Sequence, residues 1–244
     1  MLWLQAIKTA SIDKARGEKK QLIQAKGGEL QPLKKTHERY ADVFAKLGYP
    51  IDLTKHQFPV RKVISAKTQE IIGLSSKKFI GVAPFAAHRG KMYPLQLIKQ
   101  VIAQLSNSGD YAVFLFGGGA TETAQLDKLA SDFKGITNMA GKLSFTQELQ
   151  LISNLDVMLA MDSGNGHLAA LYDIPVVTIW GVTHPFLGFA PFNQPNENQL
   201  LADRTKYPLV PTSVYGNTYP DGYEKAIETI SPSAIVEKVL SVLT

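Results

Sequence analysis

The chain has 244 residues and a net charge of +5, with 45% hydrophobic residues, 19% charged residues and no cysteine. This balance is typical of a folded globular protein, and it excludes a disordered chain, a disulfide framework and a thiolate metal site. No apolar run approaches the roughly 18 residues of a membrane span and the first residues lack the pattern of a signal peptide, so a cytoplasmic protein is the default expectation.

The positive charge is concentrated in the first quarter of the chain. Residues 1–62 hold 13 Lys and Arg against 6 Asp and Glu, a net +7, whereas residues 63–244 hold 13 against 15, a net −2. This segment is either an ordinary solvated surface or a face for an anionic partner, such as lipid phosphates or the surface of a membrane. Nucleic acid is not expected as a partner, because the basic residues are not interleaved with aromatic ones and no binding motif is present.

The first 76 residues contain one clear element. Residues 7–33 show too little apolar periodicity to form a core alone, so they are expected to belong to something larger. A helix is predicted over residues 37–48, because apolar residues recur at 40, 43, 44 and 47 and Gly48 stands where a helix should stop. Residues 51–76 are mostly polar and are expected to form a linker.

From residue 79 onward, short apolar runs alternate with amphipathic stretches. The runs predict strands at 79–83, 111–116, around 136, at 157–161 and at 176–180, and the stretches between them predict helices. Ser144 and Gln147 form a capping box for one of these helices, and Pro232 begins the last one. After residue 192 the pattern weakens into loop. The alternation implies an α/β fold with a doubly wound parallel sheet, whose ligands bind at the carboxyl ends of the strands.

The most informative stretch covers residues 157–181. A strand ends in Asp-Ser-Gly at residues 162–164, a helix of small residues follows at once, and a second strand ends in Trp-Gly. The glycines of this turn allow a ligand to approach the backbone, and the free N–H groups of the new helix suit a phosphate. Ser163 and His167 are predicted hydrogen-bond donors. Asp162 would repel a phosphate, so it is expected to cap the helix or to hold His167 or a sugar hydroxyl.

These residues also carry a family resemblance. The sequence Asp-Ser-Gly-x-Gly-His-Leu-Ala-Ala at 162–170, with Pro-Val-Val-x-x-Trp-Gly-x-Thr-x-Pro at 175–185, resembles the signature of glycosyltransferase family 9, the heptosyltransferase family. The resemblance covers residues 79–192 and implies a GT-B type architecture of two Rossmann-like domains. The second domain would hold a nucleotide-sugar, usually ADP-heptose. The transfer would be inverting, without metal or other cofactor, to a lipopolysaccharide core or other anionic glycolipid acceptor.

The same resemblance implies a division of the chain. Residues 1–62 would be a remnant of the acceptor-binding first domain with a linker helix, and they would also be the segment for peripheral contact with the inner membrane. Residues 63–230 would form the donor-binding domain, and residues 231–244 a terminal helix packing back towards the first domain. The apolar faces of the terminal helix and of residues 37–47 are therefore expected to be exposed.

The catalytic base is not assigned. Family members usually begin with a strand and a glycine-rich turn that contribute a catalytic carboxylate, and nothing before Ile7 matches them, so most of the first domain is expected to be missing. The base is accordingly expected on that domain, and this chain alone is expected to show little transfer. His88 and Asp162 are the candidates for a base within the sequence.

Eight residues are predicted to bind the donor: Lys91, Glu122, Leu143, Asp162, Ser163, Gly164, His167 and Thr183. By resemblance, Lys91 contacts the diphosphate and Glu122 the ribose, while Leu143 or Met139 touches the adenine. Thr183 is a candidate for contact with the sugar, together with His184.

Each assignment has a plainer alternative. Lys91, like Arg89 and His88, is otherwise a solvated loop residue, and Glu122 is otherwise an acid well placed in the first turn of a helix. In the plainer alternative, Met139 and Leu143 are ordinary core residues, and Thr183 and His184 stabilise a loop. The plainer alternative for His167 is a buried structural residue.

Several other sites are excluded by spacing. The three glycines at 117–119 do not complete G-x-G-x-x-G, and Met-Asp-Ser-Gly at 161–164 is not a hydrolase elbow. The five histidines lack metal-ligand spacing, so no bound metal is predicted. Two alternative functions remain, a nucleotide-sugar 2-epimerase of the same fold and a non-catalytic nucleotide-binding subunit. The epimerase would turn over a UDP-sugar without an acceptor, whereas the subunit would bind a first-domain partner closely.

Overall fold

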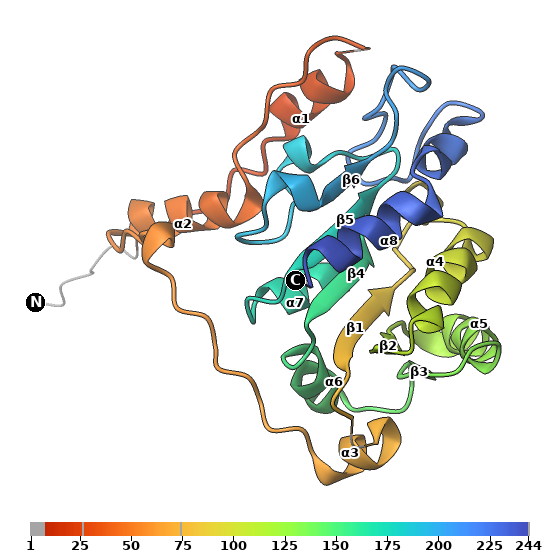
Figure 1. Ribbon diagram of the computed structural model, residues 1–244. Helices are drawn as coiled ribbons and strands as arrows, with labels where there is room; N and C mark the ends of the chain where they lie inside the picture. The colour runs from red at the N-terminus through yellow and green to blue at the C-terminus, as the bar shows by residue number, and fades with distance from the viewer. Residues whose placement is uncertain (1–7, 26, 74, 244) are drawn as a thin grey trace, which may run out of the picture.

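The computed structural model describes residues 8–25, 27–73 and 75–243, and in them a six-stranded, all-parallel sheet forms the centre of the molecule (Figure 1). The strands are β1 (Lys78–Ala83), β2 (Tyr111–Leu115), β3 (Ile136–Asn138), β4 (Val157–Met161), β5 (Val176–Trp180) and β6 (Gln199–Leu201). Their order is β3-β2-β1-β4-β5-β6. The direction of winding therefore reverses between β1 and β4, which confirms the predicted doubly wound α/β class.

Helices cover both faces of the sheet. One face carries α4 (Leu95–Asn107), α5 (Gly119–Ser131) and α8 (Pro232–Ser241), and the other carries α6 (Phe145–Ile152) and α7 (Gly164–Ala170). The remaining helices are α1 (Arg16–Ile23), α2 (Thr36–Leu47), α3 (Ala66–Ile72) and the short 3-10 helices η1 (Leu53–Lys55), η2 (Arg89–Lys91), η3 (Pro185–Leu187), η4 (Asn196–Asn198) and η5 (Tyr223–Thr229). In the part of the chain that the structure describes, no helix is long and apolar enough to cross a membrane.

The strands are apolar because both of their faces are buried. Successive strand residues point to opposite sides, so Ile80 and Val82 of β1 pack into the core under α4, α5 and α8, while Ala83 packs into the core under α6 and α7. The register places Ile80 opposite Val113 of β2 and Val157 of β4. This pairing brings the carboxyl ends of β1, β2 and β4 to one edge of the sheet.

One strand and two α-helices were not predicted. β6 lies in a stretch expected to be loop, and α3 lies within the expected linker. β6 pairs in parallel with β5, and its Gln199 is buried because the side-chain oxygen accepts a hydrogen bond of 2.9 Å from Trp180 Nε1. α1 has just two buried residues, Lys19 and Leu22. Such short elements with polar buried residues lack the apolar periodicity on which the prediction depends.

The N-terminal segment packs on the loop that follows β5. The amides of Leu33 and Thr36 donate hydrogen bonds of 2.9 and 2.8 Å to the carbonyls of Phe186 and Gly188. α2 ends at Gly48, whose φ of 100° marks the predicted stop. Its apolar face is partly exposed, as expected, since 54% of Tyr40 and 46% of Phe44 are accessible to solvent.

The last helix differs from expectation. Ile235 and Val239 of α8 are fully buried, and they belong to the core that contains α4. The prediction that the apolar face of this helix would be exposed is therefore wrong, because α4 and one face of the sheet cover it (Figure 1). The division into residues 1–62, 63–230 and 231–244 stays a prediction.

Candidate functional site

A buried cluster of charged and polar side chains lies where β1, β4 and β5 end. Lys91 belongs to η2 after β1, Asp162 follows β4 directly, and Thr183 follows β5. The Lys91 Nζ atom lies 2.8 Å from Asp162 Oδ2, and Thr183 Oγ1 donates a hydrogen bond of 3.0 Å to the same oxygen. The two charged side chains are only 13% and 6% exposed. Lys91 is thus anchored at the sheet edge, and the alternative of a solvated loop lysine does not hold.

Close backbone packing positions the Lys91 side chain. The amide of Val182, after β5, donates a hydrogen bond of 3.0 Å to the carbonyl of Gly90. Gly216 has a φ of +79°, and a Cβ atom there would lie 2.6 Å from Lys91 Cγ. Glycine at this position therefore leaves room for the lysine stem. The contribution of the loop around Gly216 was missed by sequence reasoning, because no local pattern connects residues 125 positions apart.

Asp162 does not cap α7. The N-cap residue of this helix is Ser163, and no side chain forms a cap hydrogen bond. The carboxylate of Asp162 is held instead by the Lys91 ammonium and the Thr183 hydroxyl. The ammonium adds a full opposite charge at 2.8 Å, which backbone N–H groups at a helix start do not supply. Helix capping, the first of the three roles expected for Asp162, is therefore wrong, and the contacts with His167 or a sugar hydroxyl stay predictions.

Ser163 and Gly164 form the turn between β4 and α7. The Oγ atom of Ser163 is buried and has no hydrogen-bond partner among the described residues. Buried hydroxyl groups in proteins are nearly always satisfied, so an unpaired one at the carboxyl edge of the sheet favours a ligand. Gly164 is exposed, as the prediction of an accessible helix start requires.

His167 lies one turn further along α7 and lines a cavity. More than a third of the surface of His167 is accessible, because the side chain faces this cavity. Protein atoms surround its other sides. Burial lowers the pKa of His167, the Asp162 carboxylate raises this pKa, and the Lys91 ammonium lowers it. The net effect is a lowered pKa, so the ring is neutral at pH 7 and can both donate and accept hydrogen bonds.

Glu122 and the residues assigned to adenine lie on the β2 and β3 side of the cluster. Glu122 Oε2 accepts a hydrogen bond of 2.8 Å from the amide of Gly118, so its plainer role at the start of α5 is present in the structure. Met139 is 3% exposed and belongs to the core under α6 and α7. Leu143 is half-buried against the same core, which leaves part of its side chain available to a ligand.

His184 has a structural role. Its Nδ1 atom accepts a hydrogen bond of 3.1 Å from the amide of Phe186, and the residue is 4% exposed. Burial, together with the positive charge of Arg204, lowers the pKa of His184 to about 4. His184 therefore stabilises its loop, which was the plainer of the two roles considered for it. The exposed His88, by contrast, lies outside the cluster at the start of η2.

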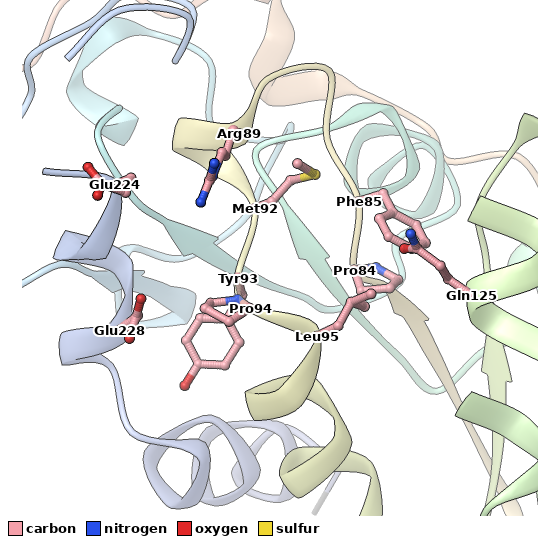
Figure 2. Close-up of a pocket in the computed structure, with 10 residues that line it drawn as sticks. All are labelled: Pro84, Phe85, Arg89, Met92, Tyr93, Pro94, Leu95, Gln125, Glu224 and Glu228. Carbon is pink, nitrogen blue, oxygen red and sulfur yellow. The ribbon is translucent and has the colours of Figure 1, made fainter. Parts of the chain in front are cut away.

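A separate cavity of about 240 Å³ lies between the loop after β1, α5 and η5 (Figure 2). Figure 2 shows the side chain of Arg89 on the side where Glu224 and Glu228 project from η5. The remaining walls are Pro84, Phe85, Met92, Tyr93, Pro94, Leu95 and Gln125. The Tyr93 hydroxyl donates to the Ile230 carbonyl at 2.5 Å, and burial raises the pKa of Tyr93 to about 12. None of the eight predicted donor residues lines this cavity.

A second cavity, of about 310 Å³, adjoins His167. It lies between α2, α7 and the loop after β5. Its lining residues are Thr36, His37, Tyr40, His167, Leu171, Gly188, Phe189, Ala190 and Phe192. Sequence reasoning missed it, because its two walls are separated by more than 120 residues. The repeated phenylalanines at 186, 189 and 192, just before the segment expected to be loop, were the available signal.

Part of the basic segment is used within the fold. Arg39 is 6% exposed, and its Nη2 atom lies 2.9 Å from Glu18 Oε2. Lys19 is also buried, with its ammonium 4.0 Å from the centre of the Phe189 ring. Burial lowers the pKa of Lys19, and the neighbouring Arg39 lowers it further. These two cations therefore stabilise the packing of α1 and α2 and are not available to an anionic partner.

The similarity to known proteins extends over most of the chain. The family model described as glycosyltransferase family 9 (heptosyltransferase) matches residues 4–218. Lipopolysaccharide heptosyltransferase 2 of Salmonella typhimurium is 29% identical over 177 residues, which cover 70% of this chain and 48% of that protein. Lipooligosaccharide heptosyltransferase 2 of Campylobacter jejuni is 24% identical over 174 residues, which cover 69% of this chain and 52% of that protein.

Solved structures show the same fold. The ADP-heptose lps heptosyltransferase II of E. coli superposes with a TM-score of 0.61 at 20% identity, covering 86% of this chain and 62% of that one. A glycosyl transferase family 9 protein of Veillonella parvula gives 0.65 at 17% identity, with 86% and 60% covered. The chain spans about half the length of the two curated relatives described above. Among the described residues, no group of three or more His, Cys, Asp or Glu could hold a metal ion.

Proposed function

Since the chain belongs to glycosyltransferase family 9, we propose that it binds ADP-heptose at the carboxyl edge of its sheet and serves in transfer of the heptose to an anionic glycolipid. The acceptor would be a lipopolysaccharide core. The observation that carries this proposal is the buried cluster of Lys91, Asp162 and Thr183 beside the unpartnered hydroxyl of Ser163. A buried cation and an unpaired donor at one strand edge suit a diphosphate.

The strand order supports an orientation for the donor. Leu143 follows β3, Glu122 follows β2, Lys91 follows β1 and Ser163 follows β4, and these strands are neighbours in that order. In the proposed orientation the adenine lies near Leu143, the ribose near Glu122 and the diphosphate between Lys91 and Ser163. The groups of a nucleotide-sugar follow one another in the same order: base, ribose, diphosphate and sugar.

In the proposed reaction, this site stabilises the leaving group. As the bond between the sugar and the diphosphate breaks, negative charge grows on the departing ADP, and Lys91, the Ser163 hydroxyl and the backbone N–H of Gly164 would stabilise it. His167, neutral at pH 7, would donate a further hydrogen bond. Asp162 would hold Lys91 in place through their ion pair and so act as a positioning residue. The transfer is proposed to be inverting and metal-independent, and the base that activates the acceptor hydroxyl is left unassigned.

The other parts of the proposal concern the surroundings of the donor site. We assign residues 63–230 to the donor-binding domain and residues 1–62 to the side that faces the acceptor. The exposed cations of residues 8–62 would make peripheral contact with anionic lipid on the cytoplasmic side of the membrane. This placement is supported by the net charge of +7 in residues 1–62.

Calorimetry with ADP, UDP and GDP tests the proposed donor. ADP should bind most tightly, and Lys91→Ala should weaken its binding by about 10- to 150-fold, the effect of a lost charged hydrogen bond. Lys99→Ala is the matched control, since Lys99 pairs with Asp132 at the surface, where its side chain is 45% exposed. EDTA should change the ADP affinity of neither the unaltered chain nor the Lys91→Ala variant. Equal or absent binding of the three nucleotides would refute the proposal, and a preference for UDP would favour the epimerase.

A further inference from the structure

The cavity of about 240 Å³ in Figure 2 lies apart from the residues assigned to the donor. Its walls come from segments that are distant in the sequence: the loop after β1, the start of α4, α5 and η5. The cavity is smaller than the roughly 300 to 1,000 Å³ of pockets for drug-sized ligands. A ligand that fits it therefore has few non-hydrogen atoms.

Three charged side chains face this cavity without a partner in the fold. Arg89 reaches it from η2, and Glu224 and Glu228 reach it from η5 (Figure 2). Among the described residues, none forms a hydrogen bond or an ion pair with these three side chains. The guanidinium nitrogens of Arg89 thus lie more than 4.0 Å from either carboxylate. A ligand that brings charges of its own can fit between them.

The rest of the cavity is mostly apolar. Phe85, Met92 and Leu95 are half-buried, so part of each side chain is open to the cavity. Phe85 lies on the side away from the charged residues (Figure 2). Tyr93 adds no polar group, because its hydroxyl is already bonded to the carbonyl of Ile230. The cavity thus has a charged side and an apolar side.

These walls narrow the kind of ligand. A guanidinium pairs with a carboxylate through two parallel hydrogen bonds, and a pair of carboxylates attracts an ammonium. A simple cation would be repelled by Arg89, and a simple anion would be repelled by Glu224 and Glu228. The apolar side favours a short hydrocarbon group. An α-amino acid with an apolar side chain carries a carboxylate, an ammonium and a hydrocarbon group on one carbon atom, and it is small enough for the cavity.

We propose that this cavity binds a free apolar α-amino acid, with Arg89 at its carboxylate and Glu224 and Glu228 at its ammonium. The site is separate from the proposed donor site, since none of the eight donor residues lines it. The two sites meet at η2, which carries both Arg89 and Lys91. The proposal goes beyond sugar transfer and does not depend on it.

The test uses L-leucine and three analogues that each lack one of its groups. Glycine lacks the hydrocarbon group, isoamylamine lacks the carboxylate, and isocaproate lacks the ammonium. Binding is followed by NMR titration of the Met92 methyl group and the Gln125 side-chain amide, which both line the cavity. L-Leucine should shift both resonances, and each analogue should bind about tenfold more weakly.

Two variants assign the charged contacts. Arg89→Gln should weaken L-leucine binding by about tenfold and should not weaken isoamylamine binding, because isoamylamine has no carboxylate. Arg61→Gln is the matched control, since Arg61 is exposed between α2 and α3 and does not line the cavity. Glu224→Gln should weaken both L-leucine and isoamylamine and should not weaken isocaproate. Its control is Glu237→Gln, at an exposed position of α8 outside the cavity.

Several results would overturn the site. One is L-leucine leaving both resonances in place up to its solubility limit, and another is glycine binding as tightly as L-leucine. Equal L-leucine affinities of Arg89→Gln and Arg61→Gln would also overturn it, because the guanidinium would then make no contact. The proposed function is tested separately by ADP binding, so its failure would leave this site standing.

Discussion

Replacing Asp162 by asparagine tests whether this carboxylate is the counter-ion of Lys91. At the observed separation of 2.8 Å, and with an effective dielectric constant of about 20, the attraction between the two charges is about 6 kcal/mol. Desolvation of both groups offsets part of it. Asp162→Asn keeps the shape of the side chain but leaves the Lys91 ammonium without its partner. Because Lys91 retains 13% exposure, we expect the free energy of unfolding to fall by about 3 kcal/mol, the lower end for broken buried pairs.

The assay is urea unfolding with and without saturating ADP. A bound diphosphate would replace the missing carboxylate as counter-ion, so ADP should stabilise Asp162→Asn more than it stabilises the unaltered chain. Asp42→Asn is the matched control. Asp42 pairs with Lys34 at 2.6 Å, but both side chains are 46% exposed, and such surface pairs contribute about 1 kcal/mol or less.

Two results would refute this reasoning. If Asp162→Asn lost no more stability than Asp42→Asn, the pair with Lys91 would not be the buried structural contact described above. If ADP stabilised the unaltered chain more than the variant, Asp162 would be a direct ligand of the nucleotide and not a positioning residue.

Two further predictions concern neighbouring residues. Gly216→Ala should weaken ADP binding, because its Cβ atom would displace the Lys91 stem. The control is Gly222→Ala, which has a similar φ of +83° and no atom within 4 Å, so it should lower stability by a similar amount without affecting ADP binding. Equal ADP affinities of the two variants would contradict this account. The folded pKa of His184, about 4, lies below its ordinary value of 6.5, so stability should be lost as the pH falls from 6.5 towards 4, by up to about 3 kcal/mol. His184→Asn should flatten this dependence in urea unfolding at a series of pH values, and an unchanged slope would assign the loss to other groups.

The regular part of the fold was predictable because its strands are buried on both faces. β4 and β5 have the predicted bounds, and β1 and β2 differ from them by one residue. Continuous apolar runs between amphipathic helices leave few alternatives to a parallel sheet. β6 was not predictable, because it has three residues and begins with Gln199, a polar residue buried by one hydrogen bond to Trp180.

The candidate site was predictable as a set of residues but not as a set of contacts. Lys91, Asp162 and Thr183 lie in the turns after β1, β4 and β5, which parallel strands present at one edge, and the family resemblance singled out Lys91 among the cations of its loop. The ion pair between Lys91 and Asp162 joins residues 71 positions apart. Its formation depends on rotamers and on the space that Gly216 leaves, which no local pattern encodes. The face of α8 was wrongly expected to be exposed, because the helix periodicity shows that a face is apolar but not what covers it.

The way α2 is attached to the sheet has a consequence for motion. An extended segment connects α2 to α3 along the outside of the molecule, and Val60 and Val63 within it are 78% and 88% exposed (Figure 1). The segment before α2 is held by a small cluster around Leu187. Units with so few buried contacts open at a lower free energy than the core of their domain, so the amides of α2 should exchange with deuterium well before those of β4. Any molecule that bridges α2 and α7 would have to be released by the same opening, and its residence time would then be set by this hinge-like unit and not by the rigid sheet.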